Sequence, residues 1–133
     1  MRGRGGADPN LIPTYPGITP KGEGAVTEYV QVITTTETRE EAQQIARGVV
    51  GKRLAACAQV LGPISSTYWW KGKIETAEEW MCVMKSDTAL YKDLESAIRE
   101  IHPYEVPEIV ALPIVTGSAS YLEWLKKELR DAR

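Results

Sequence analysis

Apolar and polar positions in the first half of this chain follow the period of a strand and then that of a helix. Residues 28–34 are β-branched and mostly apolar, which predicts a central strand. Thr38 and Glu41 then form a capping-box pattern, which predicts the start of a helix that ends near residues 52–54. The apolar stripe of this helix consists of Ala42, Ile45, Ala46, Val49 and Val50.

The segment that follows predicts one long β-hairpin. Proline cannot donate a ladder hydrogen bond, so Gly62-Pro63 indicates a bulge or an edge kink in its first arm. Each arm reaches on the order of 40 Å at about 3.3 Å per residue, more than a small sheet uses. We therefore expect the hairpin to pair with something outside its own domain. Its arms and turn comprise 55–61, 64–70, Lys71-Gly72, 73–75 and 79–85.

A second helical pattern follows the hairpin. Ser86 or Asp87 is its expected cap, and Pro103 stops it just after His102. Its apolar stripe consists of Leu90, Leu94, Ala97, Ile98 and Ile101.

The chain ends with a strand and a further helix. Residues 108–113 predict the strand, and a Ser120-x-x-Glu123 pattern predicts the start of the helix. The order β-α-β-β-α-β plus a helix predicts an α+β, ferredoxin-like fold with an antiparallel sheet, a long hairpin between its second and third strands, and an extra C-terminal helix. Both inner helices would lie on one face and leave the other uncovered, which favours oligomerisation.

Domain organisation follows from where glycine and proline gather. Residues 1–26 are rich in both, which predicts a flexible tail, while 27–133 carry the pattern of a single domain. No apolar run reaches a membrane-spanning length, and the tail lacks the apolar core of a secretory signal. We expect a cytoplasmic protein, or an organellar one in case residues 1–26 are the remnant of a transit segment.

Charge and cysteine content narrow the function classes. The formal net charge is −2, and no run of basic residues exceeds two, which argues against binding to nucleic acid or to anionic membranes. Cys57 and Cys82 lie far apart in apolar runs, so we interpret both as buried free thiols. Glu78 and Glu79 are adjacent and would point in different directions, so we interpret them as solvated surface.

The segment between the second helix and the last strand is the best candidate site. It is pinned by two prolines and offers an imidazole, a phenol and two carboxylates, from His102, Tyr104, Glu105 and Glu108. Imidazole and carboxylate together suit zinc, copper or nickel. The alternative is that His102 only caps the helix and complements its dipole. No nucleophile has a base and an orienting group in a recognisable pattern, so we expect no catalytic residues and no obligatory cofactor.

Aromatic residues near the hairpin turn form a second candidate site. Trp69 and Trp70 precede the turn, directly after Tyr68. Aromatic side chains dominate interface cores, so we expect them to contact a neighbouring subunit rather than a small ligand. Trp124 of the terminal helix is assigned to the same subunit interface.

Several segments of this sequence resemble the CutA family of divalent-cation tolerance proteins. The resemblance covers about residues 28–130 in the family's order. It rests on Ala55-Ala56-Cys57, Gly62-Pro63-Ile64, Tyr68-Trp69-Trp70-Lys71-Gly72-Lys73-Ile74, His102-Pro103-Tyr104-Glu105-Val106-Pro107-Glu108 and Tyr121-Leu122-x-Trp124.

The resemblance implies a ferredoxin-like homotrimer, similar in assembly to the PII signalling proteins, with hairpins that cross subunit boundaries. It also implies copper tolerance without enzymatic activity. In the enterobacterial type, the copper ligands are a cysteine after the first strand and two adjacent histidines. Those positions are Thr34, Ile101 and His102 in this chain, so one of the three ligands is present. Nearby carboxylates or a second subunit would have to complete a site.

Three functions remain open at this point. The first is a homotrimeric divalent-metal-binding protein, with copper as the implied ion, that responds to metal ions. The second is a PII-like trimeric sensor of a small molecule. The third is a structural or protein-anchoring trimer.

Overall fold

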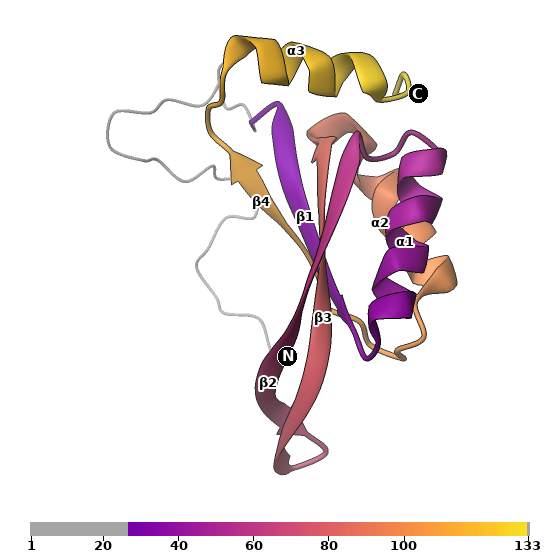
Figure 1. Cartoon of the computed structure of the whole chain (residues 1–133), viewed down its shortest axis with the longest axis vertical. Helices are drawn as coiled ribbons and strands as arrows, with labels where there is room; N and C mark the ends of the chain where they lie inside the picture. The colour runs from indigo at the N-terminus through magenta and orange to yellow at the C-terminus, as the bar shows by residue number, and fades with distance from the viewer. Residues whose placement is uncertain (1–26, 133) are drawn as a thin grey trace, which may run out of the picture.

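The computed structural model describes residues 27–132 (Figure 1). The flexible tail predicted at 1–26 lies outside the described residues. The predicted element order is confirmed, with one 3₁₀ turn added before the second helix. The elements are β1 (Tyr29–Thr36), α1 (Arg39–Gly51), β2 (Cys57–Trp70), β3 (Lys73–Asp87), η1 (Thr88–Leu90), α2 (Tyr91–Ile101), β4 (Ile109–Ile114) and α3 (Ala119–Glu128).

The four strands form one antiparallel sheet in the order β2-β3-β1-β4. Helices α1 and α2 lie side by side on one face of it, and α3 crosses one end (Figure 1). This arrangement confirms the predicted α+β ferredoxin-like fold. On the face away from α1 and α2, α3 covers only one end, where its Tyr121 hydroxyl lies 3.5 Å from Cys57 Sγ. The expectation of an uncovered face is therefore confirmed for the rest of that face.

The core lies between that sheet and the two helices. Residues opposite one another in an antiparallel pair share a face, and Val32 lies opposite Met84 in the β1–β3 pair. Both are fully buried, together with Ile45 of α1 and Leu94 and Ile98 of α2. Every second residue of β1 therefore contacts the helix layer, which is the strand period that the sequence shows.

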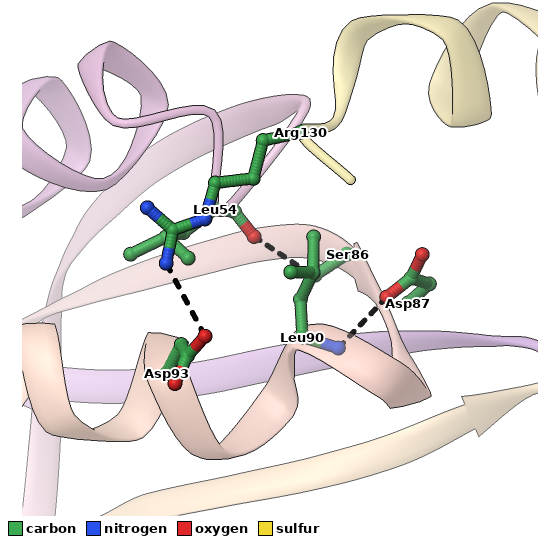
Figure 2. A network of polar contacts seen from close by, with 6 residues as sticks. All are labelled: Leu54, Ser86, Asp87, Leu90, Asp93 and Arg130. Atoms are coloured by element: carbon green, nitrogen blue, oxygen red, sulfur yellow. Dashed lines mark hydrogen bonds and ion pairs between the residues drawn. The ribbon is translucent and has the colours of Figure 1, made fainter. Parts of the chain in front are cut away.

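The first two helix caps follow the sequence. Thr38 Oγ1 accepts from the Glu41 N–H, and a Glu41 carboxylate oxygen accepts from the Thr38 N–H, both at 3.1 Å, so the capping box is confirmed. Asp87 Oδ1 accepts from the Leu90 N–H at 2.9 Å and caps η1, which leads into α2. Ser86 instead is buried and donates to the Leu54 carbonyl at 2.6 Å (Figure 2).

The predicted start of the last helix is wrong by two residues. Ser118 is the N-cap of α3, and its Oγ accepts from the Tyr121 N–H at 3.3 Å. Ser118 has the extended backbone that a cap requires, whereas Ser120 already lies within the first helical turn.

The long hairpin is confirmed and is more regular than predicted. The β2–β3 register shifts between Leu61 and Ile64, which is the bulge expected at Gly62-Pro63. The return arm is one continuous strand rather than two pieces, because Thr76 stays paired with Thr67 across the arm. β1 pairs with β3 only from Trp80 to Asp87, so the rest of the hairpin extends beyond the sheet as a free arm (Figure 1).

Candidate functional site

His102 is the buried C-cap residue of α2, and both of its ring nitrogens have backbone partners. Nδ1 accepts from the Tyr104 N–H at 3.1 Å, so Nε2 carries the proton and donates to the Thr35 carbonyl at 2.8 Å. Burial lowers the pKa of the imidazole. The neutral ring ties the end of α2 to the end of β1.

Tyr104 connects this tie to a buried carboxylate. Its ring lies 4.8 Å from the His102 ring, and its hydroxyl donates to Glu79 Oε2 at 2.7 Å. Burial first, and then the Glu79 carboxylate, raise the pKa of Tyr104. Glu79 is only 7% exposed, so its interpretation as solvated surface is wrong. Glu79 belongs to β3 and pairs with Ile64 of β2, at the point where β3 passes from the arm into the sheet.

A cleft of about 960 Å³ opens beside this pair of side chains. The hairpin arm, the end of β1 and the loop after α2 form its walls. Five glutamates and four aromatic residues line it, and no lysine or arginine is among the lining residues. The lining consists of Thr35, Glu37, Ser66, Thr67, Tyr68, Trp69, Trp70, Ala77, Glu78, Glu79, Tyr104, Glu105, Val106 and Glu108.

The structure places the predicted metal ligands in two positions. Tyr104, Glu105 and Glu108 line the cleft, while His102 lies behind Tyr104 and is not part of the lining. Within residues 27–132, no group of three or more His, Cys, Asp or Glu side chains could hold a metal ion. Coordination by His102 would require one of its two hydrogen bonds to break. Its role as a ligand stays a prediction.

The two positions that replace the family's other copper ligands do not approach the cleft. Thr34 is fully buried in the core opposite Cys82. Ile101 is 40% exposed at the end of α2, although the sequence placed it on the buried stripe. As the last residue of the helix, it is only partly covered, although its side chain lies next to Gly48 of α1.

Sequence reasoning missed the acidic half of the cleft. Glu37 follows β1, and Glu78 and Glu79 lie on the return arm. The available signal was the strand period, which places Glu79 on the same face of the arm as Ala77 and Glu75. Long-range pairing then brings that face to the loop after α2, and no local pattern predicts this.

The predicted interface aromatics are exposed in the single chain. Trp69 is 71% exposed, and Tyr68 and Trp70 are 41% exposed, all on the free arm. Trp124 is also 41% exposed, and its ring lies 5.7 Å from that of Tyr121 on α3. Their surroundings in an assembly stay a prediction.

The two cysteines are free, as expected, but differ in exposure. Cys82 is fully buried, and burial raises its pKa to about 12. Cys57 is only half-buried, because it begins the edge strand β2, and its Sγ lies 3.5 Å from the Tyr121 hydroxyl.

Among the described residues, no helix is long and apolar enough to cross a membrane.

Fold and cleft together define the class: a ferredoxin-like α+β domain with a projecting hairpin and an acidic, aromatic-lined cleft at its base. The chain belongs to the CutA1 divalent ion tolerance protein family, which matches residues 30–128.

Relatives and solved structures agree with this assignment. "Protein CutA" of Homo sapiens is 41% identical over 117 residues, which are 86% of this chain and 65% of that protein. "Divalent-cation tolerance protein CutA" of Thermus thermophilus is 38% identical over 96 residues, 72% of this chain and 93% of that protein. The crystal structure of CutA1 from Oryza sativa has a TM-score of 0.76 and 35% identity, over 80% of this chain and 97% of that one. The chain spans only 58% of a chloroplastic rice relative, "Protein CutA 1".

Proposed function

We propose that this chain acts as a homotrimeric, non-catalytic protein that binds divalent cations, copper among them, at the acidic cleft. The observation that carries the proposal is the lining of the cleft, which contains five glutamates and no basic residue. A concave, partly desolvated surface of one charge sign concentrates ions of the opposite sign. The family's description as divalent ion tolerance proteins supports the same assignment.

The proposal of a trimer is supported by the uncovered face of the sheet. By register, Ile33, Val83 and Val110 share that face, and so do Gln31 and Leu112. Val110 and Leu112 are 43% and 42% exposed, next to one another on alternate positions of the edge strand β4. Exposed apolar side chains that lie together on one face of a sheet are typical of a protein interface. Of the four aromatic residues predicted at the interface, we propose that Trp69 and Trp124 contact the neighbouring subunit, while Tyr68 and Trp70 lie on the other face of the arm from Trp69 and line the cleft.

The chemistry of the available donors favours weak metal binding. Carboxylate and phenol oxygens suit hard divalent ions, and Cu²⁺ generally binds a given N/O site more tightly than the other first-row ions. A single chain does not gather three ligands among its described residues, so we propose that a neighbouring subunit completes the site. His102 then acts mainly by holding Tyr104 at the cleft wall.

Titration of Cu²⁺ into the full chain, followed by calorimetry, tests this proposal. We expect Glu78→Gln/Glu105→Gln to weaken binding at least fivefold, because both carboxylates are exposed in the cleft and their loss leaves the core intact. Glu100→Gln/Glu123→Gln is the matched control, since it removes two exposed glutamates from α2 and α3 outside the cleft. Absence of Cu²⁺ binding, or equal weakening in both double variants, contradicts the proposal.

A third variant separates the two roles of His102. Equal Cu²⁺ affinity in the wild type and in His102→Ala would show that the imidazole is not a metal ligand and has only a structural role. A loss of affinity in folded His102→Ala, equal to that of the carboxylate variant, would restore it as a ligand.

A small-molecule sensor is the second candidate function, and the size of the cleft favours it. Ligand pockets typically measure about 300–1,000 Å³, and the cleft has that size.

We propose a cytoplasmic location, with an organelle as the alternative because relatives from rice and Arabidopsis thaliana are named chloroplastic.

A further inference from the structure

The size of the cleft exceeds what a bare metal ion occupies. Its volume is about 960 Å³, and its carboxylates come from three separate parts of the fold. Glu37 follows β1, Glu78 and Glu79 lie on β3, and Glu105 and Glu108 lie in the loop after α2. Within the described residues, no three of them come together as a metal site. Charges distributed along a cleft in this way match a ligand that carries several separate positive charges.

Glu79 is the buried member of this set of five carboxylates. It is a carboxylate with 7% exposure, and the Tyr104 hydroxyl is its hydrogen-bond partner at 2.7 Å. No ion pair joins it to a lysine or arginine of residues 27–132. A buried carboxylate without a counter-charge is costly, and a cation in the cleft would offset that cost.

The aromatic wall of the cleft suits an organic cation in particular. Tyr68 and Trp70 lie on the same face of the arm as Glu79. Glu79 pairs with Ile64 of β2, and residues 64, 68 and 70 are an even number of positions apart along that strand. Residues at alternate positions of a strand, together with their cross-strand partners, share one face. An ammonium group over an indole or phenol ring gains cation–π energy, and methylene groups gain apolar contact. The arm already makes one such contact, with Lys71 Nζ 5.6 Å from the ring of the cleft residue Trp70.

We propose that the cleft binds an aliphatic polyamine, with its ammonium groups on the glutamates and its methylene segments against the arm aromatics. The proposal rests on the proposed cation-binding function of this cleft and names a class of ligand for it. The five glutamates of the cleft repel anionic metabolites such as nucleotides, which favours a cationic ligand. In the proposed trimer the arm reaches a neighbouring subunit, so the cleft opens at a subunit boundary.

Calorimetric titration of the assembled full chain with spermidine tests the proposal. The comparison probe is hexaamminecobalt(III), which carries the same triple charge without methylene groups. We expect spermidine to bind at least tenfold more tightly than the cobalt ion. We expect Glu78→Gln/Glu105→Gln to weaken spermidine at least fivefold, with Glu100→Gln/Glu123→Gln close to wild type.

Each outcome has a defined meaning. Equal affinity for the two probes, or equal weakening in both double variants, would mean that spermidine binds only by general attraction to surface charge. Either result overturns the proposal. Binding of Cu²⁺ without spermidine overturns it as well, but leaves the proposed function standing. Binding of spermidine without Cu²⁺ supports the polyamine site and contradicts the metal function. Absence of both contradicts both proposals.

Discussion

Thr34 carries a buried hydroxyl that the fold leaves without a hydrogen bond. The side chain is fully buried, and Oγ1 is the buried polar side-chain atom without a partner among the described residues. An unpaired buried polar group costs about 1–3 kcal/mol, and valine has nearly the same shape. We expect Thr34→Val to raise the free energy of unfolding by about 1 kcal/mol, measured by urea denaturation.

Thr36 provides the control for this prediction. It is also fully buried, but its hydroxyl donates to the Thr38 carbonyl at 2.8 Å. Thr36→Val should therefore lower the free energy of unfolding by about 1 kcal/mol, because it removes the shorter of the two hydrogen bonds that the Thr38 carbonyl accepts, the other coming from the Ala42 N–H at 3.3 Å. A loss of stability in Thr34→Val as large as that in Thr36→Val would contradict the assignment of an unpaired hydroxyl.

His102 makes the stability of the fold depend on pH. Burial lowers its pKa below the ordinary value of 6.5, so the unfolded chain binds the proton more readily than the folded one. The contribution of neutral His102 to the free energy of unfolding is therefore complete above about pH 6.5, and it is lost as the pH falls toward the lowered pKa. Urea denaturation at pH 7.5 and 5.5 should show a smaller loss on acidification in His102→Gln than in the wild type. Equal losses in the two proteins would contradict this role.

At the scale of elements, α3 is held to the domain by two kinds of contact. Leu125 is fully buried against the core, whereas Arg53–Glu128 and Arg130–Asp93, both at 3.2 Å, are exposed ion pairs (Figure 2 for the second). Apolar burial in a core is worth several times more than a surface ion pair. The helix is therefore anchored by its apolar side.

This difference gives a quantitative prediction. We expect Leu125→Ala to lower the free energy of unfolding by about 2–5 kcal/mol, because it leaves a cavity. Arg130→Ala should lower it by less than about 1 kcal/mol. Chemical denaturation of the two variants under one condition tests this, and a larger loss for Arg130→Ala would show that the ion pairs anchor the helix.

The sequence predicts most of the elements because their periods are local. The apolar alternation of β1, the capping box at Thr38 and the bulge at Gly62-Pro63 each depend on a few neighbouring residues. The start of α3 was misplaced because Ser118 and Ser120 both carry capping side chains, and backbone conformation decides between them. Local composition alone does not contain that information.

The candidate site was predictable only in part for the same reason. The loop with Tyr104, Glu105 and Glu108 is one short segment, and the sequence shows it directly. Its counterpart, Glu79, joins the site through a strand pairing and a hydrogen bond across 25 residues of sequence. Adjacent glutamates usually indicate solvent exposure, and only the tertiary contact reverses that reading.

At the scale of the whole molecule, three features converge on an assembly. One face of the sheet is covered by α1 and α2 (Figure 1). The other face exposes apolar residues such as Val110 and Leu112. The hairpin arm continues beyond the sheet and carries Tyr68, Trp69 and Trp70. The cleft lies at the base of that arm, and we propose that a neighbouring subunit completes it. These features support the proposal of a homotrimer.

The mass of the protein in solution, from size-exclusion chromatography with light scattering, tests this central claim most directly. The account predicts about 44 kDa, three times the 14.8 kDa of one chain. A mass of 14.8 kDa at micromolar concentration would contradict it, because the apolar face and the aromatic arm would then have no partner.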